Sequence, residues 1–409
     1  MTVYKPRISA RKVLVDIRAG LTDRELMSKY RLSARGLASL FDKLIAANLL
    51  SLRELEERPE HLESTIDLEV AAPRLFDSQE LAIFSYRWRF STGAWIVSAP
   101  AFWENLLFFG SWNAVFYSLD CETGANPWNF RAGDVIRSSP VVADDLVCFG
   151  SWDGFVYALR ADSGSQEWRF KTRGPIWSSL VRDRNTIFFT SSDGVLYALD
   201  SLTGAMRWFF RVKGATLLWA QSSPVVHEGF VFIGTPEGYL YALDSSTGEV
   251  AWQYKARQPV DCSPAAADRV VYFGSGARTL RALNCSTGEE LWRLDTDRAV
   301  FASLAVVGSM VSFSSLDGAL LAIDRESGRE KWRFSVKKGV FTTSVASHGV
   351  LYFGCSDHNL YAMELETGRN LWSFSTDGAV LSTPRVRKQT LYVGSTDGYL
   401  YALPIMLEL

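Results

Sequence analysis

The sequence predicts a mainly β protein, an eight-bladed β-propeller of four-stranded antiparallel blades, preceded by a small all-α three-helix domain. Three observations predict the propeller. Tryptophans recur at spacings of 40 residues, with one spacing of 44; a Thr-Gly or Ser-Gly pair precedes seven of them; and a segment of the form GSxDGxxYAL occurs eight times. A fixed period of about 40 residues is typical of stacked supersecondary units. The recurring tryptophans are Trp88, Trp128, Trp168, Trp208, Trp252, Trp292, Trp332 and Trp372.

The first element, residues 1–52, is basic, with ten Lys or Arg and four Asp or Glu. We expect a helix over roughly 8–18 and a second one that runs to Tyr30, because Thr22 and Glu25 form a capping box. A third helix would carry one apolar face made of Leu37, Leu40, Phe41, Leu44 and Ile45. This arrangement resembles the helix-turn-helix of small DNA-binding regulators.

Two interpretations of this module stay open. As a DNA-binding module, it would contact bases or phosphates through Arg31, Arg35, Ser39 and Lys43. Gly36 and Asp42 are poor choices for a helix that enters a DNA groove, so a protein-docking or dimerising module is an equal alternative.

An acidic linker over residues 53–80 follows, with three basic and nine acidic residues. The reversal of charge at this point indicates a solvated connection between two units.

The propeller is predicted over residues 81–409, where each repeat contains four short strands separated by turn residues. The third strand of each repeat is apolar at successive positions, as expected of a sheet covered on both faces. The first tryptophan strand, 86–90, has no partner strand before it, and the last YAL strand has no tryptophan strand after it. We therefore expect strand 86–90 to complete the last blade and close the ring.

The YALD-x-x-TG-x-x-x-W unit resembles the tryptophan-docking repeat of the pyrroloquinoline-quinone-type propellers. That family includes quinoprotein dehydrogenases, the propeller lipoprotein of bacterial outer-membrane assembly and sensor domains. The resemblance implies a fold rather than one function, because enzymes and non-catalytic binders share it. The quinoprotein enzymes use a vicinal Cys-Cys pair and a calcium ion, and this sequence has neither a Cys-Cys pair nor a gathering of carboxylates. We therefore expect no catalysis and no cofactor or metal.

The candidate binding residues are those in which the repeats differ. Two positions before the Ser-Ser pair of each inner strand the residue is aliphatic or small in every repeat, whereas the next residue varies. Because side chains alternate along a strand, the varying residues would line the mouth of the central channel. An alternative is that they only plug the channel. The candidates in this set are Arg137, Trp177, Gln221, Asp261, Phe301 and Phe341.

Most tryptophans outside the repeat fall on one arc of the rim that surrounds the channel mouth. Five of them lie in connections of blades one to four, beside the only insertion, near VKGATLLWAQ: Trp95, Trp112, Trp152, Trp177 and Trp219. Exposed tryptophan is enriched at binding hot spots. We expect a protein or peptide partner to meet this rim.

The remaining features favour a cytoplasmic protein without membrane spans. No apolar run approaches the roughly 20 residues that a membrane helix needs, and the N-terminus lacks the apolar core of a signal peptide. The cysteines are scattered, which favours reduced, buried thiols: Cys121, Cys148, Cys262, Cys285 and Cys355.

The sequence thus favours a recognition or sensing propeller coupled to a basic helix-turn-helix-like module that responds to a ligand or partner. A protein-binding scaffold without nucleic acid is the alternative, and a quinone-dependent dehydrogenase is the least favoured function.

Overall fold

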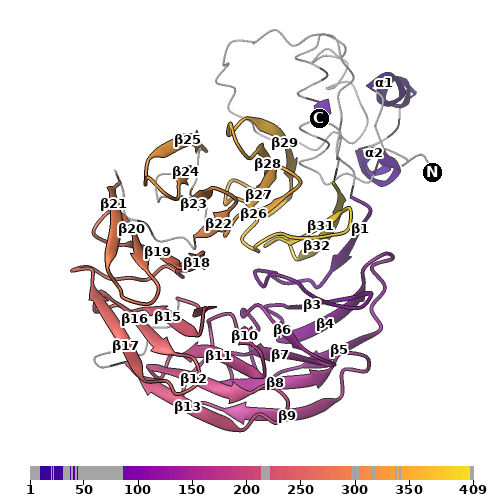
Figure 1. Cartoon of the computed structure of the whole chain (residues 1–409). Helices are drawn as coiled ribbons and strands as arrows, with labels where there is room; N and C mark the ends of the chain where they lie inside the picture. Colours follow the sequence, from indigo (N-terminus) through magenta and orange to yellow (C-terminus); the bar gives the residue numbers. More distant parts are fainter. Residues whose placement is uncertain are drawn as a thin grey trace.

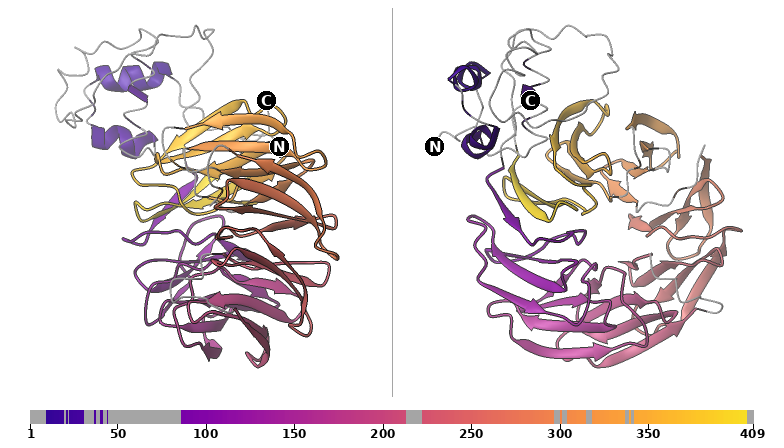
Figure 2. Two further views of the ribbon diagram at one scale, coloured as in Figure 1. Left: turned by 90° about the vertical axis from the view of Figure 1, so that its left-hand side faces the viewer. Right: turned by 180° about the vertical axis from the view of Figure 1, so that it is seen from behind.

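The computed structural model describes residues 10–19, 21, 23–30, 37, 40, 41, 44, 86–212, 222–296, 300, 304–314, 318–336, 339 and 342–405. These residues form two α-helices and 32 strands. The strands make eight four-stranded antiparallel sheets, arranged as blades in a ring (Figure 1). Figure 2 shows the same ring from the side and from behind. The mainly β, eight-bladed fold expected from the sequence is confirmed.

Each blade is a meander in which consecutive strands pair. Blades one to four comprise β2 (Ala101–Trp103), β3 (Leu106–Gly110), β4 (Val115–Asp120) and β5 (Trp128–Arg131); β6 (Val141–Ala143), β7 (Leu146–Gly150), β8 (Phe155–Arg160) and β9 (Gln166–Lys171); β10 (Val181–Asp183), β11 (Thr186–Ser191), β12 (Val195–Asp200) and β13 (Met206–Arg211); and β14 (Val225–His227), β15 (Phe230–Gly234), β16 (Tyr239–Asp244) and β17 (Val250–Lys255).

Blades five to eight continue the same pattern. They comprise β18 (Ala265–Ala267), β19 (Val270–Ser275), β20 (Thr279–Asn284) and β21 (Glu290–Asp295); β22 (Ala305–Val307), β23 (Met310–Ser314), β24 (Ala319–Asp324) and β25 (Glu330–Ser335); β26 (Val345–Ser347), β27 (Val350–Gly354), β28 (Asn359–Glu364) and β29 (Asn370–Ser375); and β30 (Arg385–Arg387), β31 (Thr390–Gly394) and β32 (Tyr399–Pro404), joined by β1 (Trp88–Ser91).

Blade eight is built from both ends of the propeller. The N-terminal strand β1 pairs antiparallel with β32, with Trp88 opposite Ala402 and Ser91 opposite Tyr399. Figure 1 shows β1 beside β31 and β32, which come last in the chain. The strand that the sequence assigns to the last blade therefore does pair there.

The recurring tryptophans fasten each blade to the next. Seven of them donate the indole Nε1–H to a backbone carbonyl of the following blade, at 2.8–3.3 Å: Trp88, Trp128, Trp168, Trp208, Trp252, Trp292 and Trp332. Each ring also covers the glycine of the following Thr-Gly or Ser-Gly turn. At Gly204, for example, φ is +70° and an added Cβ would lie 2.6 Å from Trp168 Cε3. Only glycine tolerates both the backbone conformation and the approach of the ring.

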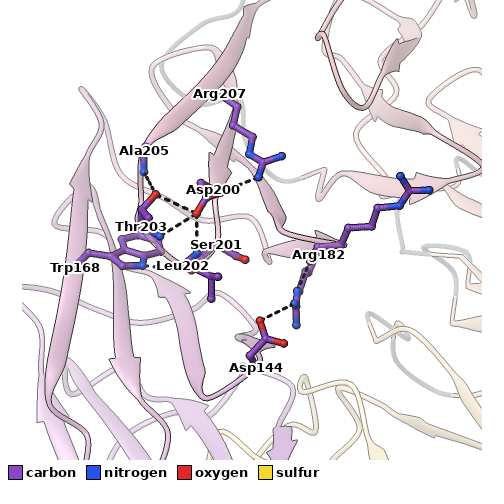
Figure 3. Close-up of polar contacts among 10 residues, drawn as sticks. Asp144, Trp168, Arg182, Asp200, Ser201, Leu202, Thr203, Ala205 and Arg207 are labelled. Atoms are coloured by element: carbon purple, nitrogen blue, oxygen red, sulfur yellow. Dashed lines mark hydrogen bonds and ion pairs between the residues drawn. The ribbon is translucent and has the colours of Figure 1, made fainter.

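In four of the seven turns that receive a docking tryptophan, an aspartate organises the turn, as drawn for blade three in Figure 3. Asp200 accepts hydrogen bonds from the backbone N–H of Leu202 and of Thr203, at 3.1 and 3.0 Å, and from Arg207 at 2.7 Å. The Arg207 hydrogen bond is the main influence that lowers the pKa of Asp200, to about 2. Asp200 thus fixes the DSLTG turn, residues 200–204. The Ser201 carbonyl in this turn is placed to accept the hydrogen bond from Trp168 Nε1.

The Ser-Ser segments tie together the inner parts of blades one to five. Ser139 N donates to Ser179 Oγ at 3.2 Å, and Ser179 N donates to Ser223 Oγ at 2.9 Å. The aliphatic residues before these segments are fully buried, as the sequence predicts, at Ile96, Ile136, Ile176, Val260, Val300 and Val380. Each rests on a glycine of the preceding blade; a Cβ at Gly110 would lie 2.2 Å from Ile136 Cγ2.

The described part of the N-terminal module contains α1 (Ala10–Arg18) and α2 (Asp23–Tyr30). Their apolar side chains share a core with four helical residues of the third predicted helix; the buried members are Val13, Ile17, Leu26, Leu37, Leu40, Phe41 and Leu44. Asp16 of α1 bonds Lys29 at 2.8 Å, and this contact is the main influence that lowers the pKa of Asp16. No helix within the described residues is both long and apolar enough to cross a bilayer. The domain limits at residues 52 and 80 stay predictions, because residues 45–85 lie outside those described.

Candidate functional site: a tryptophan row at the channel mouth

The candidate site lies on one rim of the ring, called the entry rim here. It is formed by the segments that enter each blade, such as residues 92–100, and by the turns between second and third strands, such as 111–114. The two are joined by hydrogen bonds: Trp112 N donates to Trp95 O at 3.0 Å, and Trp152 N donates to Val135 O at 2.9 Å. Trp95, Trp112 and Trp152 therefore share this rim, as the sequence predicts, whereas Trp103, at the end of β2, lies toward the opposite rim.

Four indoles on the entry rim form a continuous row. Ring centroids of Trp95 and Trp112 lie 4.7 Å apart, those of Trp112 and Trp152 5.5 Å apart, and those of Trp152 and Trp177 5.2 Å apart. Trp95, at the end of the row, is 47% exposed, and the other three are half-buried. The row of Trp95, Trp112, Trp152 and Trp177, called the tryptophan row below, spans blades one, two and three.

The fold does not require tryptophan at these positions. The residue equivalent to Trp112 and Trp152 donates its backbone N–H to the entering segment at 2.9–3.3 Å in six blades, whatever its side chain. In four of those blades the residue is small: Ser192, Gly276, Ser356 and Thr396. The equivalents of Trp177 include Val97 and Leu381. The tryptophan row is therefore an addition to the propeller rather than part of its framework.

The indole N–H groups of the row differ from those of the docking tryptophans. Nε1 of Trp112, Trp152 and Trp177 is buried, and no described residue accepts a hydrogen bond from it. A buried donor without an acceptor costs about 1–3 kcal/mol. The seven docking indoles described above all have a carbonyl partner, so the fold supplies acceptors where tryptophan is structural.

Arg137 adds a positive charge to the same stretch of the mouth. It occupies in blade two the position that Trp177 occupies in blade three, and the bond from Ser139 to Ser179 holds these two entering segments side by side. Arg137 is half-buried, and no described residue forms a hydrogen bond or ion pair with its guanidinium. Burial lowers the pKa of Arg137 from its ordinary value. The charge is thus partly removed from water without a counter-charge.

Carboxylates stand on the blade-four and blade-five side of the mouth. Burial, with a smaller contribution from Glu237, raises the pKa of Asp261. In four blades the turn residue equivalent to Glu237 is an aspartate that accepts a bond from a tyrosine hydroxyl, as Asp153 does from Tyr157 at 2.7 Å. Glu237 differs from these: its Oε2 is buried, and no described residue bonds it. Arg137 therefore stands on the blade-two side of the mouth, and the carboxylates of Glu237 and Asp261 stand on the blade-four and blade-five side.

Several predicted site residues lie outside those described by the structure. They are Trp219, Gln221, Phe301 and Phe341 of the rim and Arg31, Arg35, Ser39 and Lys43 of the N-terminal module. The insertion near VKGATLLWAQ also lies there. Their roles stay predictions.

Metal and redox chemistry find little support among the described side chains. Within that part of the chain, no group of three or more His, Cys, Asp or Glu residues is placed to hold a metal ion. All five cysteines are buried and none forms a disulfide, as expected from their spacing. Burial raises the pKa of the Cys148 thiol to about 12, which makes it a poor nucleophile.

One sizeable cavity, of about 510 Å³, lies away from the tryptophan row. It is at the seam between blades eight and one, beside the turn that contains Asn105, on the rim opposite the entry rim; its lining includes Arg87, Cys121 and Lys388. Lys388 already contacts Glu122 at 3.8 Å, and Arg87 donates to Gln389 O at 3.3 Å. The cavity gathers no unsatisfied buried donors comparable to those of the row.

Comparison with protein families agrees with the geometry of the blades. The family described as outer membrane protein assembly factor BamB matches residues 85–208, 117–262, 256–356 and 317–405, which together cover the whole propeller. The chain belongs to this family. The match confirms the resemblance to the pyrroloquinoline-quinone-type repeat propellers.

Solved structures show the same fold at low identity. BamB from Moraxella catarrhalis superposes with a TM-score of 0.69 and 20% identity, covering 79% of this chain and 100% of that one. The computationally designed Ika8 protein gives 0.69 at 17% identity, covering 77% and 98%. Sqt1 of Saccharomyces cerevisiae gives 0.69 at 14% identity, covering 78% and 98%. A comparison with curated proteins found no match.

Sequence reasoning found the rim tryptophans but missed two features. It did not predict that the indoles of the tryptophan row touch in series, because contacts between blades depend on ring orientation. It also missed Glu237, although a glutamate in TPEG, where most repeats have aspartate, was a readable signal.

Proposed function

We propose that this protein is a non-catalytic, protein-binding scaffold whose partner docks on the entry rim of blades one to four, over the tryptophan row. The observation that carries the proposal is that four large aromatic side chains sit in contact at positions where other blades use small residues. Tryptophan and arginine clustered at the centre of a surface are typical of binding hot spots. The family description, an assembly factor, is compatible with such a role.

The test compares proteins captured by variants of the full-length chain in its cells of origin. Trp112→Ser with Trp152→Ser copies the residue of blade three, Ser192, so the turns should persist. A buried hot-spot aromatic contributes about 2 kcal/mol, roughly 30-fold in affinity. We expect at least one protein captured by the wild type to be depleted more than tenfold by the double variant, with little change in melting temperature.

The matched control is Leu202→Ser, an exposed apolar residue (43%) in the turn before the outer strand of blade three. It should leave the captured proteins unchanged. Equal capture by the wild type and by the double tryptophan variant would contradict the proposed surface. Unfolding of the double variant would instead show that the row is part of the core.

A regulator that couples the propeller to DNA is the second candidate. It is favoured by the excess of basic residues over 1–52 and by the helical core shared by α1, α2 and Leu37. If it is correct, full-length protein should retain duplex DNA at low salt and lose it steeply as salt rises. Arg35→Ala should lower sequence specificity, and Lys43→Ala should weaken binding to all sequences alike.

A cytoplasmic location fits both candidates, because five buried cysteines that form no disulfide suit a reducing compartment. Fractionation of cells that carry the full-length gene would test this expectation.

A further inference from the structure

The tryptophan row offers more than apolar area, because its unsatisfied polar groups have a common chemistry. Three buried indole N–H groups lack an acceptor among the described residues, and the guanidinium of Arg137, in the entering segment next to that of Trp177, lacks a counter-ion there. All of these groups are hydrogen-bond donors. A ligand that satisfies them must present several acceptor oxygens, at least one of them negatively charged.

We propose that the tryptophan row and Arg137 recognise a carboxylate-bearing, extended segment of a partner protein. The segment's carbonyl or carboxylate oxygens accept bonds from the indoles, and its carboxylate pairs with Arg137. This inference rests on the proposed protein-binding function and specifies what the site selects. Arg137 suits the role because guanidinium pairs with carboxylate through two parallel hydrogen bonds.

The geometry argues against a nucleic acid as the occupant of this row. The central indoles, Trp112 and Trp152, each contact an indole on either side, so their faces are not free platforms for bases. Single-stranded nucleic acid also needs a positive groove along its backbone. Here the mouth becomes negative at Glu237 and Asp261, which would repel a phosphate chain.

The polarity of the mouth sets the direction of the segment. A segment whose carboxylate pairs with Arg137 and that continues along the row past Trp177 reaches the blade-four and blade-five side of the mouth, where Glu237 and Asp261 lie. A basic or neutral residue is favoured there, opposite Asp261 and Glu237. The selected sequence should therefore be acidic at one end and basic or neutral at the other.

The test uses a library of random 12-residue peptides, presented to the full-length protein with either free or amidated C-termini. We expect enrichment of peptides with a carboxylate at one fixed place. Enrichment only among free C-termini identifies the terminal carboxylate as the group bound, and enrichment of Asp or Glu in both pools identifies a side chain. Single-stranded oligonucleotides of the same length are the competing probe.

The variant that isolates Arg137 is Arg137→Leu, because Leu381 occupies the equivalent place in blade eight. It should weaken the best selected peptide by about 10- to 100-fold, as expected for loss of a hydrogen bond to a charged group. Replacing the peptide carboxylate by an amide should weaken wild-type binding similarly and leave the Arg137→Leu protein indifferent. Arg131→Leu, an exposed arginine of β5, is the control and should bind as the wild type does.

Three outcomes would overturn the inference: selected peptides without acidic groups, equal affinity for carboxylate and amide forms, or preferential binding of the oligonucleotides. The first two remain distinguishable from failure of the proposed function. If binding is lost in Trp112→Ser with Trp152→Ser but not in Arg137→Leu, the row still docks a protein and only the carboxylate preference is wrong.

Discussion

At the scale of single residues, tryptophan has two separate uses in this molecule. Trp168 is fixed by a hydrogen bond from Nε1 to Ser201 O at 3.3 Å, whereas Trp152 of the tryptophan row has no acceptor for the same atom. The repeat register separates these groups in the sequence, because docking tryptophans follow the Thr-Gly pair and rim tryptophans do not. Whether an indole has an acceptor depends on the neighbouring blade, so the sequence alone could not predict it.

Asp261 gives a prediction about pH at this scale. Burial and then Glu237 raise its pKa, so the ionised form is less stable in the folded protein than in the unfolded chain. The stability linked to this group is present below its unfolded pKa of about 4 and is lost as pH rises through its higher folded pKa. Asp261→Asn should therefore raise the melting temperature at pH 7, and the gain should shrink toward pH 3. Thermal melts between pH 3 and 8 would measure it.

Glu237→Gln is the companion variant for this measurement. It removes the smaller of the two influences on the pKa of Asp261. A modest part of the gain in melting temperature from Asp261→Asn should therefore disappear in the Glu237→Gln background. A difference between Asp261→Asn and the wild type that is independent of pH would argue against an ionised, poorly solvated Asp261.

At the scale of elements, the turn between the third and fourth strands contains the recurring Thr-Gly or Ser-Gly pair. The sequence predicted its aspartate and glycine from turn chemistry, and the structure places both as expected. It did not predict the irregular register between β12 and β13 at Ala198 and Leu199, where the pairing shifts. Such a shift follows from the twist of the outer strand against its neighbour, which periodicity does not encode.

Alanine substitutions at Gly204 and Gly229 separate two contributions to the free energy of unfolding: disturbed tryptophan docking and backbone strain. Gly204→Ala would place a methyl group 2.6 Å from Trp168 Cε3 at φ +70°, whereas Gly229→Ala, at φ +81°, meets nothing within 4 Å. Each should lose about 1–2 kcal/mol from the left-handed backbone. Gly204→Ala should lose roughly 1–3 kcal/mol more, because the indole must move. Chemical denaturation of the two variants would compare them, and equal losses would mean that the ring shifts freely.

At the scale of the whole molecule, the period of the repeats made the blade number and the closure of the ring predictable. Each blade is built from the same strands and turns. A strand or turn that is hard to predict in one repeat can therefore be assigned from the other seven. The N-terminal module has no such redundancy: its helices and core positions were predictable from apolar spacing, but its binding function was not. The partner's identity is equally absent from the pattern, since the tryptophan row is confined to blades one to three and does not recur in the other repeats.

Closure of the ring by β1 gives the last prediction. A chain that begins at residue 86 keeps β1, and one that begins at residue 95 lacks it, so the pair differs in the closing strand but not in the N-terminal module. Without β1, the edge of β32 loses its partner, and Gly124 loses the ring of Trp88, whose Cδ2 atom would lie 2.7 Å from an added Cβ. Loss of a packed tryptophan alone costs about 3–5 kcal/mol, which corresponds to roughly 4–8 °C in melting temperature for a domain of about 320 residues, because the unfolding entropy is about 2.1 cal/mol/K per residue.

We expect the chain from residue 86 to melt like the full-length propeller and the chain from residue 95 to melt well below it. The shorter chain should also self-associate, because an unpaired strand edge is a template for pairing with another copy. Trp88→Ala in the full-length chain should cost about as much as Trp252→Ala, since both indoles donate to a carbonyl of the next blade, at 3.1 and 2.8 Å. Calorimetry and sedimentation would measure both effects. If the chain from residue 95 melts with the chain from residue 86 and stays monomeric, β1 is an appendage and the ring holds together without it.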